Sequence, residues 1–207
     1  MSNEEVESVK LILIGEASVG KSSIIYRYIN NEFNTGIRAT NGASYCKKDL
    51  KIKGKDVELN IYDTAGQDRY KTLNKFFYKN AYLVCLVYDI TNQGSLESLK
   101  GYWYKDIKDY GEKSIIFAVV GNKSDLYENG NLANEDEARK FAEEINAIFV
   151  LTSAKTGTGI NELFTSLAEK YLNPENKSII NEIIKERSES FLLNDGKNDG
   201  CCKKKCC

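Results

Sequence analysis

The chain has 207 residues, of which 42% are hydrophobic and 29% charged, and its 29 Lys and Arg residues nearly balance 30 Asp and Glu residues. This length suits one α/β domain with a tail, the apolar content excludes a disordered chain, and no apolar run is long enough to span a membrane. The sequence contains no histidine and has a net charge of −1, which excludes imidazole-based nucleophile systems and HExxH zinc sites and argues against a nucleic-acid-binding surface.

An apolar run at residues 9–14 predicts the first β-strand, and a helical pattern at 21–30 follows it. Between them, residues 15–22 read GEASVGKS, which has the spacing and the context of a phosphate-binding loop. The two glycines let main-chain N–H groups point at phosphate oxygens, the lysine supplies a charge for the β- and γ-phosphates, and the serine offers a hydroxyl to Mg²⁺. The residues expected to bind phosphate are Gly15, Ala17, Ser18, Val19, Gly20, Lys21, Ser22 and Ser23.

Two short runs at 50–52 and 57–61 flank Lys53-Gly54-Lys55 and predict a hairpin that places one antiparallel strand at the sheet edge. The second run leads into DTAGQDRY at 63–70. Asp63, at the carboxyl end of its strand, can hold Mg²⁺ through water, and Gly66 can offer its N–H to the γ-phosphate. Gln67 can orient the attacking water, so we expect it to be the catalytic residue.

Further apolar runs at 81–88, 115–120 and 147–151 predict buried strands, and helical patterns at 95–110, 134–145 and 159–172 alternate with them. This alternation predicts an α/β fold: a doubly wound, mostly parallel six-stranded sheet with one antiparallel edge strand and helices on both faces. Such sheets bind their ligands at the carboxyl ends of the strands.

The last two predicted strands end in motifs that favour guanine over adenine. Residues 121–125 read GNKSD, in which the aspartate can accept the N1–H and N2–H of guanine, the asparagine can contact N7 and the lysine can lie along the base. Residues 152–155 read TSAK, in which the alanine N–H can reach the guanine O6 and the lysine can cover the ring. The expected base contacts are Asn122, Lys123, Asp125, Leu126, Ser153, Ala154 and Lys155.

The composition changes near Leu172, so we expect a folded domain at 1–172 and a largely flexible tail at 173–207. The isoleucines between 179 and 184 favour one or two helical turns, and the segment is either an extension of the last helix, a disordered stretch or a partner-binding helix. Residues 201–207 read CCKKKCC, whose lysines favour an anionic membrane surface rather than a zinc site. Cys46 and Cys85 are expected to be small core residues in a reducing compartment.

Residues 6–172 resemble the Ras superfamily of small GTPases, whose five nucleotide motifs are those described above. Within it the chain is similar to the Rab proteins, through Gly42-x-x-Tyr45, YDTAGQDRY at 62–70 and Phe77-Tyr78-Lys79-Asn80-Ala81. The switch segments resemble those of endosomal Rab proteins. The resemblance implies that Phe33 stacks on guanine and that Thr40 ligates Mg²⁺, together with Ser22 and with Asp63 through water.

The resemblance also implies a GTP-hydrolysing switch of vesicle traffic that binds Mg²⁺ and GTP or GDP and turns over slowly without an activating protein. Its implied partners are an exchange factor, a GTPase-activating protein, a GDP-dissociation inhibitor, a prenylation escort protein, and effectors that contact residues 33–45 and 62–78. Cys206 and Cys207 match a double-geranylgeranyl site, which predicts the cytosolic face of intracellular membranes and a soluble pool. Cys201 and Cys202 are either palmitoylated or unmodified.

Three positions depart from the Rab pattern: Asn41, Tyr62 and Asp68. They leave the residues expected to bind phosphate and Mg²⁺ unchanged and alter the surface that partner proteins recognise. A second function stays open, in which the protein hydrolyses GTP slowly or not at all and works as a nucleotide-dependent recruitment module. The residues Ala17, Thr40 and Gln67 favour the cycling enzyme.

Overall fold

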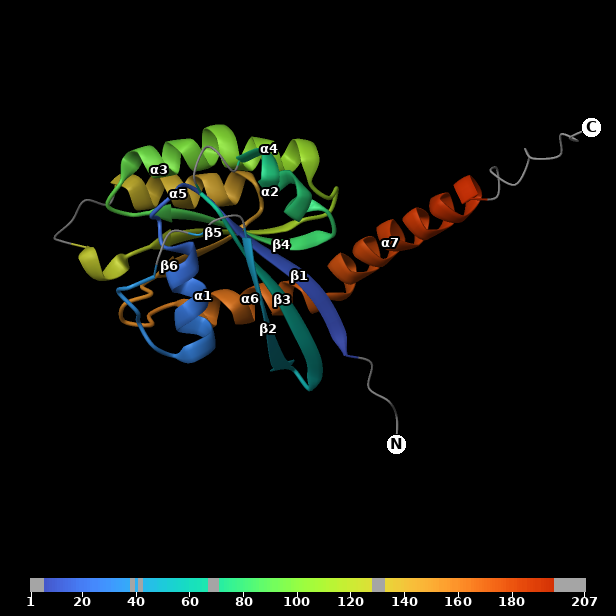
Figure 1. The fold of residues 1–207 in the computed structure, drawn as a ribbon, viewed down its shortest axis with the longest axis horizontal. Coiled ribbons are helices and arrows are strands. Elements are labelled where there is room, and N and C mark those ends of the chain that lie inside the picture. The colour runs from blue at the N-terminus through green and yellow to red at the C-terminus, as the bar shows by residue number, and fades with distance from the viewer. Residues whose placement is uncertain (1–5, 38–39, 41–42, 67–70, 128–132, 196–207) are drawn as a thin grey trace, which may run out of the picture. The chain divides into compact units, whose positions relative to one another are not determined.

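Within the described residues, six strands form one sheet in the order β2-β3-β1-β4-β5-β6 (Figure 1). The structure is a computed structural model that describes residues 6–37, 40, 43–66, 71–127 and 133–195. The strands are β1 (Glu7–Ile14), β2 (Ala43–Ile52), β3 (Lys55–Thr64), β4 (Ala81–Asp89), β5 (Ile116–Asn122) and β6 (Ile148–Thr152). All neighbouring pairs are parallel except β2 and β3, so the predicted mostly parallel sheet with one antiparallel edge strand is confirmed.

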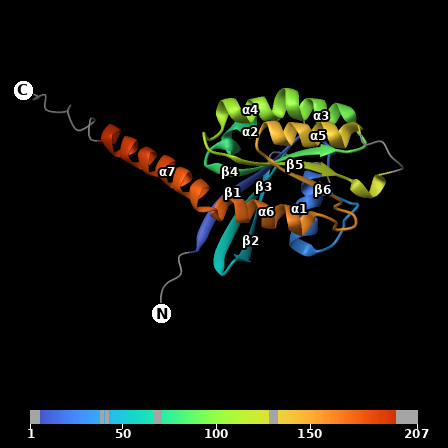
Figure 2. The same ribbon diagram turned by 180° about the vertical axis from the view of Figure 1, so that it is seen from behind.

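Helices cover both faces of this sheet, as the doubly wound prediction requires. The helices are α1 (Lys21–Asn30), α2 (Lys71–Tyr78), α3 (Gln93–Ser98), α4 (Tyr104–Tyr110), α5 (Ala133–Glu144), α6 (Ile160–Leu172) and α7 (Pro174–Asp195). Helices α2 to α5 lie on one face, and α1 and α6 lie on the other, which Figure 2 shows from behind. Strands β4 and β5 are buried along their whole length, so the core extends on both sides of them.

The hairpin strands are longer than the sequence predicted, because pairing extends beyond the apolar runs. Strand β2 begins at Ala43, well before the predicted start at 50, and its lysines alternate between the exposed and the half-buried side. A polar edge strand such as β2 gives a weak hydrophobic signal, since only one of its faces packs against the protein. Helix α2 was also not predicted from the sequence.

The predicted helix at 95–110 begins at Gln93 and contains a π-helical turn at Leu99–Trp103, between α3 and α4. Because a π-helical turn aligns residues five apart, Ser98 and Trp103 reach the same neighbour. Both donate to the carboxylate of Glu16 in the phosphate loop, Trp103 through its Nε1 at 3.3 Å. The π-helical turn thus connects this helix to the loop after β1.

The chain divides into two units, Met1–Tyr171 and Leu172–Cys207. The second unit contains α7, a 22-residue helix where we expected a largely flexible tail with one or two helical turns. We interpreted Pro174 as the end of a helix, but proline is also favoured in the first turn of a new one. The side chain of Asn173 caps this new helix by accepting from the Glu175 N–H at 3.1 Å.

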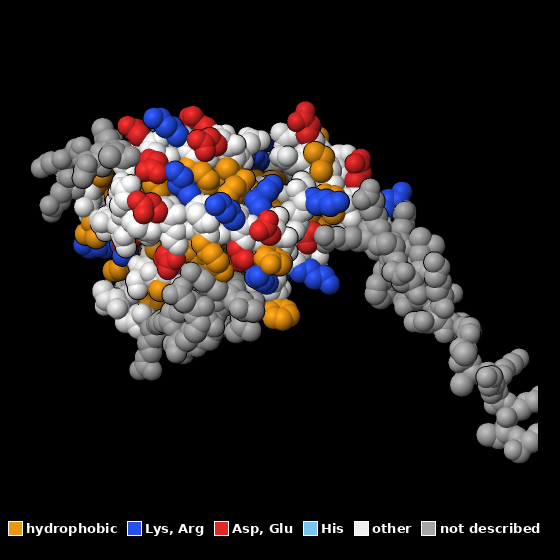
Figure 3. Space-filling model, turned by 90° about the horizontal axis from the view of Figure 1, so that it is seen from above, with side chains coloured by type: hydrophobic (Ala, Val, Ile, Leu, Met, Phe, Trp, Pro, Cys, Tyr) orange, Lys and Arg blue, Asp and Glu red, His pale blue; other side chains and the backbone are white. Residues whose placement is uncertain are grey.

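The face that carries α3 and α4 shows acidic and basic side chains interspersed, with hydrophobic side chains between them (Figure 3). Lys100 and Glu137, from the π-helical turn and α5, form an ion pair at 2.7 Å. In the part of the chain that the structure describes, no helix is long and apolar enough to cross a bilayer.

Removal of the hydroxyl group is expected to affect the free energy of unfolding differently at two buried tyrosines. The Tyr78 hydroxyl donates to Asp106 Oδ2 at 2.8 Å, whereas the buried Tyr28 hydroxyl has no hydrogen-bond partner among the described residues. We expect Tyr78→Phe to lower the free energy of unfolding by about 1–3 kcal/mol, because it leaves a buried carboxylate oxygen without its donor. Tyr28→Phe is expected to leave the free energy of unfolding unchanged or to raise it.

Urea unfolding measures both changes, and because the substitution is the same at both positions, each variant is the control for the other. The stacking of the Tyr28 ring on Phe164, with centroids 3.7 Å apart, remains possible after Tyr28→Phe. Equal destabilisation of the two variants would contradict this assignment of the hydrogen bonds.

Candidate functional site

A cavity of about 470 Å³ lies at the carboxyl ends of the parallel strands, where the loop after β1 meets the loops after β3, β5 and β6. Most of the residues predicted to bind the nucleotide line it. They are Ala17, Ser18, Gly20, Lys21, Ser22, Ser23, Phe33, Thr40, Gly66, Asn122, Lys123, Asp125, Leu126, Ala154 and Lys155. The sequence motifs therefore converge on one site.

The remaining predicted residues that the structure describes sit directly behind this lining. The Gly15 and Val19 carbonyl oxygens accept hydrogen bonds from Lys21 and Asn122, and Asp63 and Ser153 hydrogen-bond to Ser22 and Asp125. Gln67 and the tail cysteines Cys206 and Cys207 lie outside the described residues.

The phosphate loop wraps the start of α1. Gly20 has a positive φ of 99°, and a Cβ there would lie 2.2 Å from the Asn122 Nδ2, so glycine is required by both conformation and space. Lys21 turns back over the loop, and its Nζ donates to the Gly15 and Glu16 carbonyl oxygens at 2.9 and 2.8 Å. The ammonium group is thereby fixed at the floor of the cavity.

Lys21 is only 6% exposed, and burial lowers its pKa to about 8, although the charges of Asp63 and Glu16 partly offset this effect. A buried ammonium group loses hydration that its neutral carbonyl acceptors replace only in part. A phosphate anion in the cavity would supply the missing opposite charge. The site is therefore built to favour an anionic ligand at this end.

Three oxygen atoms converge beside the lysine. The Ser22 and Thr40 hydroxyls both donate to Asp63 Oδ2, at 2.6 and 2.9 Å, and their own oxygens are 2.8 Å apart. With Asp63 ionised, only the two hydroxyl protons are available for these three oxygen–oxygen contacts. The second carboxylate oxygen of Asp63, Oδ1, is buried without a partner among the described residues. Burial raises the pKa of Asp63, and the two hydroxyls and Lys21 act against that rise.

This oxygen set fits Mg²⁺, which prefers oxygen ligands and binds through one or two carboxylates together with substrate phosphates. Ser22 and Thr40 would hold the ion directly and Asp63 through water. The buried, unpartnered oxygen of Asp63 is the observation that supports this fit.

The other end of the cavity has the polar groups expected for guanine. Asp125 accepts from the Ser153 hydroxyl at 2.6 Å through Oδ1, and its Oδ2 lies 3.7 Å from the Lys155 Nζ. These contacts fix the carboxylate and leave accepting capacity on its second oxygen. Phe33 also lines the cavity, is 41% exposed and offers an aromatic ring.

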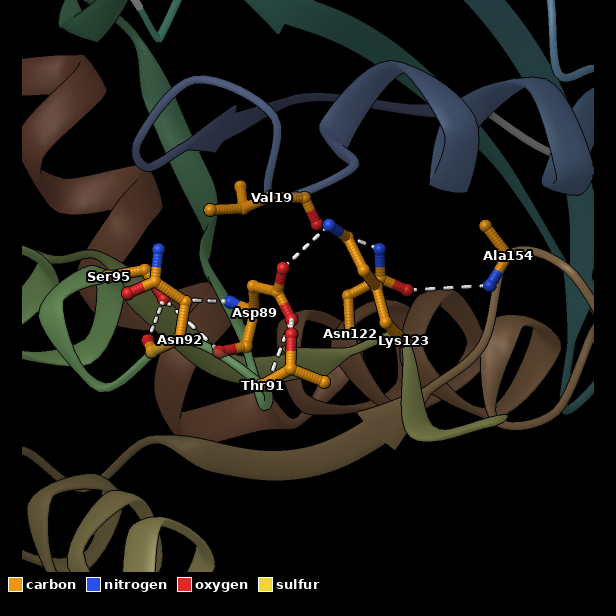
Figure 4. A network of polar contacts seen from close by, with 8 residues as sticks. All are labelled: Val19, Asp89, Thr91, Asn92, Ser95, Asn122, Lys123 and Ala154. Carbon is orange, nitrogen blue, oxygen red and sulfur yellow. Dashed lines mark hydrogen bonds and ion pairs between the residues drawn. The ribbon is translucent and has the colours of Figure 1, made fainter. Parts of the chain in front are cut away.

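Asn122 joins the two ends of the cavity (Figure 4). Its Nδ2 donates to the Val19 carbonyl oxygen at 2.8 Å, and its Oδ1 accepts from the Thr152 hydroxyl at 3.2 Å and from the Ala154 N–H at 3.4 Å. One buried side chain therefore holds the phosphate loop and the loop after β6. The long contact to Ala154 leaves that N–H able to bind a base oxygen.

Gly66 brings the segment after β3 against the phosphate loop. A Cβ at this position would lie 2.5 Å from the Ala17 N and from the Glu16 carbonyl oxygen, both main-chain atoms that cannot move aside easily. Only glycine allows this approach. The main chain leading to Gln67 thus starts at the phosphate end of the cavity.

Sequence reasoning missed four residues at the site. Ile37 and Thr64 line the cavity, Asp89 binds the Lys123 Nζ at 2.6 Å, and Arg27 binds the loop after β6. Asp89 ends β4, so its place at the carboxyl end of a strand was a usable signal. Arg27 lies in the last turn of α1, away from any strand end, and has no such signal.

The comparisons with known proteins agree with this geometry. The Ras family profile matches residues 10–173. The GTP-binding protein ypt5 of Schizosaccharomyces pombe is 41% identical over 162 residues, which cover 78% of this chain and 76% of that protein. The human Ras-related protein Rab-22A is 36% identical over 165 residues, covering 80% and 84% of the two chains. Rab-1C of Dictyostelium discoideum is 38% identical over 161 residues, covering 77% and 79%.

Proposed function

Because the chain belongs to the Ras family and is a Rab-type small GTPase, an enzyme that hydrolyses GTP, we propose that it acts as a cycling switch of membrane traffic. It alternates between GDP- and GTP-bound forms and recruits effectors when GTP is bound. The observation that carries this proposal is one cavity that combines a buried lysine, a convergent oxygen set and a fixed Asp125 carboxylate.

At the phosphate end, Lys21 and the loop N–H groups bind the β- and γ-phosphates, and Ser22 and Thr40 would hold Mg²⁺ directly and Asp63 through water. When bound, Mg²⁺ neutralises the charge that develops on the phosphate oxygens. At the base end, Asp125 accepts the N1–H and N2–H of guanine, Asn122 contacts N7, and the Ala154 N–H donates to O6. Lys123, Lys155, Leu126 and Phe33 enclose the ring.

For hydrolysis, Gln67 positions water in line with the γ-phosphate. No histidine exists to act as a base, and phosphoryl transfer of this kind depends on positioning and charge stabilisation rather than on a strong base. Intrinsic turnover is slow, and an activating protein that supplies an arginine accelerates it by roughly 10³- to 10⁵-fold, the magnitude known for this enzyme class.

The switch output is a change of surface. Loss of the γ-phosphate removes the contacts of Thr40 and Gly66, so that residues 33–42 and 64–78 loosen, within the surface at 33–45 and 62–78 that effectors contact. On the described part of this surface Tyr45, Tyr62 and Phe77 form an aromatic row, with ring centroids 5.2 and 6.1 Å apart. Effectors, the exchange factor and the activating protein are expected to contact it.

The tail places the switch on a membrane. Cys206 and Cys207 carry two geranylgeranyl groups, added with the help of an escort protein, because two lipid anchors are needed for stable residence. A GDP-dissociation inhibitor returns the GDP form to a cytosolic pool. The similarity to ypt5 and Rab-22A supports the cytosolic face of endosomal or other intracellular membranes.

Single-turnover release of phosphate tests the cycling enzyme against a locked recruitment module. Gln67→Leu is expected to lower the rate at least about tenfold, because the attacking water loses its orienting group. The measurement uses GTP labelled at the γ-phosphate and loaded onto native and variant protein.

Gln93→Leu provides the matched control, since Gln93 donates to Glu137 on α5, away from the cavity. This control is expected to keep the native rate. Equal rates for native protein and Gln67→Leu would contradict the cycling enzyme and favour the locked module.

A further inference from the structure

The guanidinium group of Arg27, in the last turn of α1, binds three main-chain oxygens from two loops. Its Nε donates to the Ala154 carbonyl oxygen at 2.7 Å and its Nη2 to the Lys155 carbonyl oxygen at 2.5 Å. Its Nη1 donates to the Asn31 carbonyl oxygen at 2.8 Å. Arg27 itself is not among the residues that line the cavity.

Both loops carry groups at the base end of the cavity. Ala154 and Lys155 line it directly, and Asn31 begins the segment that leads to Phe33. The Asn31 N–H also donates to the Arg27 carbonyl oxygen at 2.8 Å, and Asn31 has a positive φ of 56° that ends the helix. Arg27 and Asn31 thus hold each other through two hydrogen bonds.

The shape of the guanidinium group matters for this arrangement. Its donors are fixed in one plane, so three bonds determine the orientation of the acceptors as well as their distance. The bonds to Ala154 and Lys155 fix the two peptide groups that directly follow the Ala154 N–H. A lysine at this position would carry the same charge as a single point and could not hold all three oxygens in one geometry.

We propose that Arg27 is a positioning residue for guanine recognition, which orients the Ala154 N–H toward the base O6 by holding the peptide groups behind it. This inference rests on the proposed function, because it assumes that guanine occupies this end of the cavity. Arg27 acts through the loop and does not touch the nucleotide.

A double-substitution cycle between Arg27 and the base oxygen tests the inference. The ligands are GDP and 6-thio-GDP, in which a weaker acceptor replaces O6. For native protein the sulfur is expected to lower the affinity about tenfold, the effect of one good hydrogen bond in a buried site. Arg27→Met is expected to lower the affinity for GDP about tenfold but to make the further loss with 6-thio-GDP less than about threefold.

Arg27→Lys gives a second variant that keeps the charge. It is expected to fall between native protein and Arg27→Met in both the GDP affinity and the sulfur penalty. If Arg27→Met does not fold, this variant alone completes the cycle. A loss of stability without a positioning role would leave the sulfur penalty at its native value, and that result overturns the inference.

Two further measurements separate the possible failures. Chelation of Mg²⁺ by EDTA acts at the phosphate end and is expected to accelerate GDP release by the same factor in native protein and in Arg27→Met. Unequal factors would show that Arg27 acts on the whole site and would overturn its specific role. If native protein does not prefer GDP over ADP, the proposed function fails. If native protein prefers GDP and the affinity losses caused by Arg27→Met and by the sulfur are additive, only the Arg27 inference fails.

Discussion

Lys21→Met is expected to lower the affinity for GDP and GTP by roughly 10²- to 10³-fold, the loss typical of removing one partner of a buried charged pair. The ammonium group is buried, its carbonyl acceptors are neutral, and a phosphate would be its strongest partner at the cavity floor. Competition against a fluorescent GDP analogue measures the loss.

Lys155→Met is the matched control, because Lys155 lines the same cavity at its base end and has a side chain that is 63% exposed. Exposed ion pairs contribute little, so its effect is expected to stay below about tenfold. Thermal unfolding without nucleotide checks that Lys21→Met folds. Equal losses for the two variants would contradict the assignment of the phosphate end.

Asp125→Asn is expected to invert the base preference, with GDP bound roughly 10²-fold more weakly and xanthosine diphosphate bound more tightly than GDP. The carboxylate accepts two donors from guanine, whereas an amide can donate to the xanthine O2. The Ser153 hydroxyl, which donates to Asp125 Oδ1 at 2.6 Å, can still donate to the amide oxygen, so the loop remains supported.

Titration with both nucleotides measures the inversion, and Ser153→Ala serves as the control. Removing that hydroxyl loosens the carboxylate without changing its chemistry, so both affinities are expected to fall in parallel. An unchanged preference in Asp125→Asn would mean that the base pocket lies elsewhere.

The sequence predicted the sheet and most of the site for the same physical reason. Strands buried on both faces are apolar throughout, and the parallel ones bring their carboxyl-terminal residues to one edge, where Asp63 and Asn122 lie in the last residues of β3 and β5. Loop motifs with fixed spacing therefore identify both the residues and their position at the carboxyl ends of the strands. Their positions needed no knowledge of side-chain packing.

The parts that could not be predicted depend on which neighbours a residue meets. Pro174 fits the end of one helix or the start of the next, and only the capping by Asn173 decides between them. The π-helical turn has no distinguishing composition, because its buried Leu99 and Trp103 also fit an ordinary helix. The role of Arg27 depends on where three carbonyl oxygens point, and the pattern of residue types along the sequence does not predict this.

The side chain of Asn122 has a consequence for ligand design. Since it bonds both to Val19 beside the phosphates and to Ala154 beside the base, each half of the cavity constrains the other. Fragments such as guanosine and pyrophosphate are then expected not to bind independently, because each contacts a loop that Asn122 holds against the other. An inhibitor confined to the base half would therefore also stiffen the phosphate loop, without carrying any negative charge of its own.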